Sequence, residues 1–331
     1  MMAVLARAEL FVLAAVAFAL LSSAVCSLLV PGVLARVQGW EPWRRHTVVL
    51  GLSLAPAALT GLLLLSALAP TLLSLIDASF DHCVGHDDHH AHLCFFHGPH
   101  HAAHVWIWAC LAAVVTWVGA QLVVRLVDVL RASARARVLV RTGERAAEPA
   151  LTIIDANRPY CATVGLLAPR VLASRSLLDA LAPVQRAALI AHEASHVRRR
   201  DALVRLCAGM MSALYPPRHR RALARALEVA AEQASDEEAA RVVGDRLVVA
   251  ETILCVERAL SQSAEAPLGL VAVGIHQAAV AQRVEALLAA PQVGGSLVGV
   301  LGAVGVSVAG LAAASGWLHH AVESWLSRLL H

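Results

Sequence analysis

Four stretches of this chain are long and apolar enough to cross a lipid bilayer, which takes about 20 helical residues. They run roughly from Leu10 to Val30, Val48 to Leu68, Val105 to Val127 and Val293 to Ala314. The composition fits, because 58% of the 331 residues are hydrophobic and 15% are charged, unlike a soluble globular domain. The first stretch resembles a signal peptide, but its length favours a retained helix. We therefore expect a mostly α, polytopic membrane protein with four transmembrane helices.

The arginines predict how these helices are oriented, since cytoplasmic loops are rich in basic residues. Arginines follow the first and third apolar stretches, whereas residues 77–104 contain none. This pattern predicts a multi-pass protein of the plasma membrane. Both chain ends and residues 77–104 lie outside, and residues 128–292 lie in the cytoplasm. The net charge of +3 is spread along the chain, so we expect no direct contact with nucleic acid.

Residues 77–104 form a histidine-rich segment between the second and third predicted helices. Cys83 and Cys94 in this external loop could form a disulfide. Histidine and aspartate side chains suit divalent metals, although a solvated loop without an ion explains the composition equally well. The candidate external metal ligands are His82, His86, His89, His90 and His92.

The predicted cytoplasmic region is large enough for one compact domain. Its first part is rich in β-branched residues and punctuated by glycine and proline, which indicates short strands. From Ala182 the pattern becomes helical, with a break at Pro216 and Pro217. We expect three parts: residues 1–127 with three transmembrane helices, an α+β domain at 128–292, and residues 293–331 with the fourth helix and an interfacial tail.

The stretch "IAHEASHVRRRD" carries the most specific chemistry. On a helix, His192 and His196 project from the same side one turn apart, so both imidazoles can reach one ion. Glu193 lies beside them, where its carboxylate can act as a general base. Alternatively, the histidines only satisfy local hydrogen bonds. Arg198, Arg199 and Arg200 follow, and we expect them to face solvent, anionic lipid or substrate.

An acidic pair completes the predicted zinc site. Glu232 and Asp236 are also one helical turn apart. Glu232 can serve as the third protein ligand, and Asp236 can accept a hydrogen bond from the far nitrogen of a ligand histidine. Glu228 is a rival ligand, and a solvated acidic helix face is the alternative interpretation.

The segments "HEASHVRRRD" and "ALYPPRHRRALARALEVAAEQASDEEAAR", with the lead-in "PYCATVGLLAPRVLASRSLLDALAPVQRAALIA", resemble the BlaR/MecR-type integral-membrane zinc peptidases. They are more distantly similar to HtpX-type and CAAX endopeptidases. The resemblance implies a gluzincin-type domain with one catalytic Zn2+ on His192, His196 and Glu232, and Glu193 as the base. It also implies supporting roles for Asp201 and Asp236 outside the ligand set, and substrate alignment by a strand around 163–167.

We therefore expect a membrane zinc endopeptidase that cuts a cytoplasmic regulator, a BlaI/MecI-type transcriptional repressor, after an external signal. The sequence contains no visible penicillin-binding domain, so direct β-lactam binding is not expected. Two alternatives are a quality-control protease of the HtpX kind and a non-catalytic metal sensor that uses the histidine-rich loop. Candidates for stabilising the oxyanion are Tyr160, His219 and Arg241.

Overall fold

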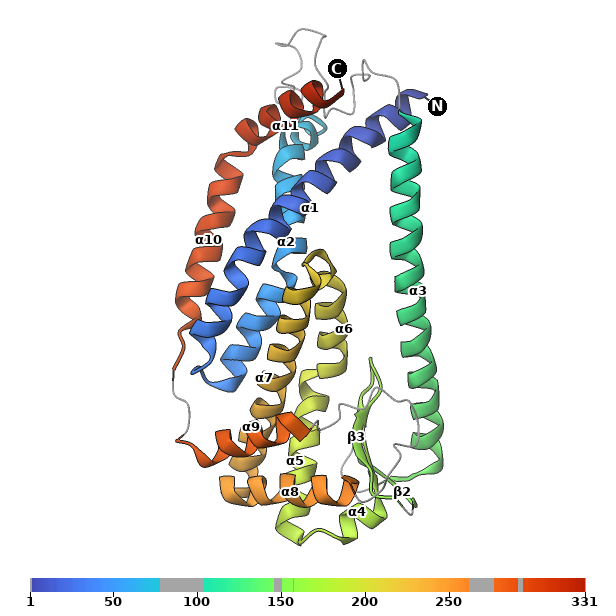
Figure 1. Cartoon of the computed structure of the whole chain (residues 1–331), viewed down its shortest axis with the longest axis vertical. Coiled ribbons are helices and arrows are strands. Elements are labelled where there is room, and N and C mark those ends of the chain that lie inside the picture. Colours follow the sequence, from blue (N-terminus) through green and yellow to red (C-terminus); the bar gives the residue numbers. More distant parts are fainter. Residues whose placement is uncertain are drawn as a thin grey trace.

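The computed structural model describes residues 2–77, 104–145, 151–156, 158–261, 277–290 and 294–330. Long apolar helices fill one end of the molecule, a small sheet with short helices forms the other end, and one long helix runs from the first end down to the sheet (Figure 1). The long helices are α1 (Met2–Val37), α2 (Pro42–Ser74), α3 (Val105–Thr142) and α7 (Pro217–Val243). The other helices of more than one turn are α4 (Arg175–Asp179), α5 (Pro183–Arg199), α6 (Asp201–Met211), α8 (Arg246–Ser261), α9 (Gln277–Leu288), α10 (Leu297–Ala313) and α11 (Ser315–Leu330).

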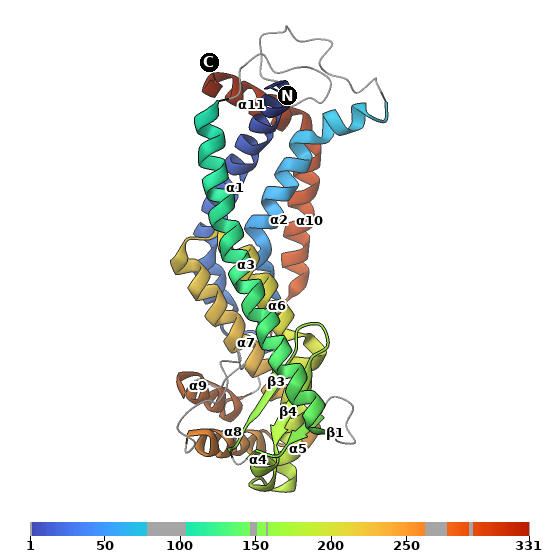
Figure 2. The same ribbon diagram turned by 90° about the vertical axis from the view of Figure 1, so that its right-hand side faces the viewer.

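Two of the described helices are long and apolar enough to cross a membrane, Ala8–Val37 within α1 and Pro42–Ser74. The pair α10 and α11 passes the same test only when taken together, and it bends by 65° at the break between them. The predicted span from Val105 to Val127 forms the first part of α3, which continues as one helix down to the sheet (Figure 2). The structure thus supports two spans, or three if α10 and α11 together form one, and the predicted span from Val105 to Val127 stays a prediction.

The short connection between α1 and α2 packs against the start of α10. The Trp40 ring lies so close to Gly295 that a side chain there would clash with it. Gly295 also has a φ of 90°, which favours glycine. Arg44 donates a hydrogen bond to the Gly295 carbonyl. Gly295, which lies within the predicted span from Val293 to Ala314, therefore precedes α10, which begins at Leu297.

The sheet has four strands, β1 (Glu144–Arg145), β2 (Leu151–Ile154), β3 (Cys161–Val164) and β4 (Arg170–Ser174). Their order is β1-β2-β4-β3, with β2 parallel to β4 and the other pairs antiparallel. One face packs its apolar side chains against α4, α5 and α8. The opposite face packs Val164 and Leu172 against Val140 of α3. Among the described strands β3 has one neighbour, so its other edge is unpaired.

α5 and α7 pack side by side in the interior of the predicted α+β region. Alanines on both helices, including Ala188, Ala191, Ala239 and Ala240, are buried and permit a close approach. α7 is also tied to the long helices, because Arg45 of α2 donates a hydrogen bond to Gln233. At the turn before α7, Tyr215 donates to the Leu52 carbonyl of α2 at 2.7 Å. The helix that carries the acidic pair is therefore anchored to a membrane-length helix, and the helix with the histidines packs against it.

Candidate metal centre

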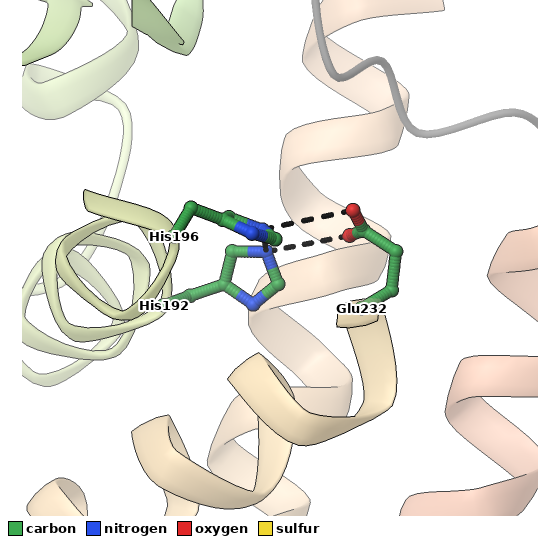
Figure 3. A group of neighbouring side chains, drawn as sticks. All are labelled: His192, His196 and Glu232. Atoms are coloured by element: carbon green, nitrogen blue, oxygen red, sulfur yellow. Dashed lines mark hydrogen bonds and ion pairs between the residues drawn. The ribbon is translucent and has the colours of Figure 1, made fainter. Parts of the chain in front are cut away.

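His192, His196 and Glu232 converge between α5 and α7 (Figure 3). The two histidines lie one turn apart on α5, and Glu232 faces them from α7. The Nε2 atoms of the two histidines are 3.1 Å apart. One possible ligand atom from each of the three residues lies within 4.8 Å of the others. All three side chains are buried. Two imidazole nitrogens and a carboxylate so arranged form a group that could hold a metal ion.

The Glu232 carboxylate presents one oxygen to each histidine. Its Oε2 lies 3.5 Å from His192 Nε2, and its Oε1 lies 3.6 Å from His196 Nε2. Two arginines balance the negative charge of Glu232. Arg283 Nη1 lies 3.2 Å from Oε2, and Arg205 Nη2 lies 3.6 Å from Oε1. Burial alone would raise the pKa of Glu232, but the hydrogen bond with His192 and the nearby positive charges lower it. Glu232 is therefore ionised, as a metal ligand must be.

Each histidine has a carboxylate at the nitrogen that faces away from Glu232. His192 Nδ1 lies 2.9 Å from Asp236 Oδ1, and His196 Nδ1 lies 2.5 Å from Asp201 Oδ2. Ionised carboxylates only accept hydrogen bonds, so the Nδ1 atoms donate and both Nε2 atoms remain for an ion. Burial raises the pKa of Asp201, but its hydrogen bonds with His196 and Arg199 outweigh this and lower the pKa to about 2.

Glu193 is positioned by the sheet. Thr163 on β3 donates a hydrogen bond from Oγ1 to Glu193 Oε2 at 2.7 Å. Thr163 points towards α5 because its neighbours Ala162 and Val164 alternate to the other face of β3. The glutamate beside the histidines is thus held at the free edge of the sheet.

A pocket opens between α5, α8 and α9 beside His192 and Glu193. Its walls are mainly apolar and so suit an aliphatic side chain. The apolar side chains that line it include Leu189, Val249, Ile253 and Val256.

One of the three arginines after His196, Arg199, departs from our expectation that they face outward. Arg199 is half-buried and joins α5 to α7, because it bonds to Asp201 Oδ2 at 2.7 Å, to Ser235 Oγ at 2.7 Å and to the Ala231 carbonyl. Arg198 is exposed and pairs with Glu238. Arg200 adopts a left-handed conformation with φ 53° at the turn between α5 and α6. This turn brings Asp201 back towards His196, so the expectation holds for Arg198 and fails for Arg199.

The other predicted residues do not contact the two histidines or Glu232 within the described part of the chain. Glu228 is more exposed than Glu232 and lies 4.0 Å from Arg205, so the rival ligand does not join the histidines. Tyr160 packs with Val164 and Leu172 on the α3 side of the sheet. Arg241 bonds to Glu238 at the surface, and His219 lies in the first turn of α7. None of the three oxyanion candidates reaches the histidines by a contact among the described residues.

The predicted disulfide and external metal ligands of the histidine-rich segment fall within residues 78–103, which lie outside the described residues. This range contains Cys83, Cys94, His82, His86, His89, His90 and His92.

Sequence reasoning missed the role of Arg283, and of the Thr163 hydroxyl. Arg283 lies on α9, distant in sequence from both acidic and histidine motifs, yet it contacts Asp236 and Glu232. One signal was present in the sequence, since Arg283 is the single arginine between Arg258 and Arg328.

A buried His-His-Glu group beside a further glutamate, in a chain with membrane-length helices, is the arrangement of a membrane metallopeptidase. The family comparison agrees: the chain belongs to the BlaR1 peptidase M56 family, whose model matches residues 100–287, more than half of its length. This confirms the BlaR/MecR-type resemblance at the level of the family. Comparison with curated proteins and with solved structures gave no match.

Proposed function

We propose that this protein is a zinc endopeptidase that cuts a cytoplasmic regulator in response to a signal from outside the cell. The observation that carries the proposal is the convergence of His192, His196 and Glu232, with Glu193 beside them. Two histidines and a glutamate are an established ligand set of catalytic zinc, which leaves a position for water or substrate. When bound, zinc supplies Lewis acidity to the scissile carbonyl and to the attacking water.

In this proposal Glu193 is the general base. Its carboxylate accepts the proton of the attacking water and later delivers it to the leaving amine. Thr163 holds Oε2 of this carboxylate at 2.7 Å, which restricts its orientation and leaves Oε1 for the proton. Asp236 and Asp201 hold the two imidazole rings in the tautomer that a metal ligand requires.

β3 is the element that would align the substrate. Its outer edge is unpaired among the described strands, and Thr163 at its centre contacts the proposed base. An extended peptide can add to such an edge through main-chain hydrogen bonds. The scissile bond would then lie beside Glu193, with a neighbouring apolar side chain directed to the pocket lined by Leu189 and Ile253.

We propose a BlaI/MecI-type transcriptional repressor as the substrate. Two observations support this class: the family membership, and the arginine distribution, which favours a cytoplasmic site. A soluble repressor meets such a site directly, without crossing the membrane.

The test is cleavage of a candidate repressor by the full chain in lipid nanodiscs, with Glu193→Ala beside the wild type. We expect the variant to bind one zinc ion as the wild type does and to lose cleavage by at least about 100-fold, since general-base catalysis contributes about 10²–10⁴. Cleavage at the wild-type rate in Glu193→Ala would end the proposed mechanism. Wild-type cleavage of unfolded membrane proteins but of no repressor would favour quality control instead.

A further inference from the structure

Arg283 is the largest fully buried side chain among the described residues, at 2% exposure. It enters the metal centre from α9, a helix that carries none of the histidines or acidic residues predicted for the site. A buried guanidinium is costly unless its charge and its donors are matched by partners. Its contacts therefore indicate what the residue does.

The guanidinium of Arg283 contacts Asp236 with two nitrogens. Nε donates to Oδ2 at 2.8 Å, and Nη2 donates to Oδ1 at 2.6 Å. The third nitrogen, Nη1, lies 3.2 Å from Glu232 Oε2. Arg283 thus spans the two carboxylates that project from successive turns of α7, and Nη2 also lies 3.4 Å from His192 Nδ1.

We propose that Arg283 is a positioning residue for the metal centre, an inference that rests on the proposed zinc site. By binding both oxygens of Asp236, Arg283 fixes the orientation of the carboxylate that accepts the hydrogen bond from His192 Nδ1. By attracting Oε2 of Glu232, Arg283 also sets the direction from which the Glu232 carboxylate approaches the Nε2 atoms of the two histidines. A planar guanidinium suits this task because its donors lie in a fixed fork, which an ammonium group lacks.

A purely structural role in docking α9 is the competing explanation, and the fold provides a control for it. Arg246 of α8 also holds α9, through bonds of 2.8 Å to the carbonyls of Ala286 and Ala289. It pairs with Glu237 on α7 at 2.6 Å. Arg246 contacts none of the three proposed ligands, so its loss should loosen α9 without changing the metal centre directly.

The experiment measures Co2+ and Zn2+ affinity by competition with a chelator, using the full-length chain in detergent. Four proteins are compared: wild type, Arg283→Lys, Arg283→Met and Arg246→Met. Groups that orient metal ligands typically change affinity by about 10–100-fold. We expect about tenfold weaker binding for Arg283→Lys, about 100-fold for Arg283→Met and less than about threefold for Arg246→Met. The visible absorption of bound Co2+ should change in Arg283→Lys and stay unchanged in Arg246→Met.

The inference is overturned if Arg283→Lys binds both metals like the wild type with an unaltered Co2+ spectrum. It is also overturned if Arg246→Met weakens binding as much as the Arg283 variants, because docking of α9 would then explain the effect. If Arg283→Met does not fold, Arg283→Lys decides alone, since it keeps the positive charge. A wild-type chain that binds no metal, or binds it equally well after Glu232→Ala, would refute the proposed zinc site itself.

Discussion

The hydroxyl of Thr163 donates a hydrogen bond that joins the sheet to the proposed base. We expect Thr163→Val to reduce the rate of peptide cleavage about tenfold while leaving zinc affinity unchanged, since one buried hydrogen bond to a charged group is worth about 1.5 kcal/mol. Thr152→Val is a matched control, because this buried hydroxyl on β2 has no hydrogen-bond partner among the described residues. Steady-state kinetics would contradict the account if both variants lost the same activity.

His192 makes metal binding depend on pH. Burial lowers its pKa, but the hydrogen bonds to Asp236 and Glu232 outweigh burial and raise it to about 9 in the metal-free protein. The pKa of a histidine in the unfolded chain is about 6.5. Protonation of His192 therefore stabilises the metal-free fold fully at a pH below about 6.5, and this contribution is lost as the pH rises through about 9.

An ion must displace that proton, so we predict release of about one proton per zinc bound at pH 7. Apparent affinity should rise with pH until about 9. Calorimetry in two buffers with different ionisation enthalpies measures the release, and Asp236→Asn should reduce it. Zinc binding at pH 7 without proton release would show that His192 is neutral before the metal arrives.

At the scale of elements, the turn between α5 and α6 determines whether Asp201 reaches His196. Arg200 occupies this turn with φ 53° and an exposed side chain. A left-handed residue with a side chain costs about 1–2 kcal/mol, and glycine avoids most of that cost. We predict that Arg200→Gly leaves thermal stability unchanged or slightly raised, and that Arg200→Val lowers it by more than about 1 kcal/mol because β-branched residues disfavour this conformation.

Thermal unfolding and zinc affinity of the two Arg200 variants provide the check. If Arg200→Val matched the wild type in both, the turn would not control the contact between Asp201 and His196.

Contacts within one helix could be predicted from the sequence, whereas contacts between elements could be predicted only where the chemistry of a metal site requires them. A spacing of four residues places His192 beside His196, and Glu232 beside Asp236, whatever the rest of the fold does. The role of Asp236 as acceptor for a ligand histidine also followed from chemistry, because a ligand imidazole needs an acceptor at its far nitrogen. That the partner is His192 came from the structure.

The contributions of Thr163 and Arg283 depend on how a strand and a distant helix pack, which no local pattern encodes. The small sheet followed by helices was recognisable from glycine, proline and β-branched residues. The contacts by which half-buried Arg199 joins α5 to α7 were not recognisable from the sequence, because a run of three arginines by itself indicates a solvated surface.

At the scale of the molecule, the metal centre is linked to membrane-length helices through α7. Arg45 of α2 bonds to Gln233, which neighbours Glu232, and Gln233 in turn lies 3.4 Å from the carbonyl of Gln282 beside Arg283. A shift of α2 would therefore act on both α7 and α9. These contacts connect a membrane-length helix to the residues beside Glu232 and Arg283.

The most direct test of the account is zinc content and zinc-edge X-ray absorption of the purified full-length chain, compared with Glu232→Ala. We predict that the variant holds one zinc ion fewer than the wild type. The zinc that it loses should have only nitrogen and oxygen ligands, including two imidazoles, at about 2.0–2.2 Å. An equal zinc content in the two proteins, or sulfur ligands at about 2.3 Å, would contradict the assignment of His192, His196 and Glu232 as the metal centre.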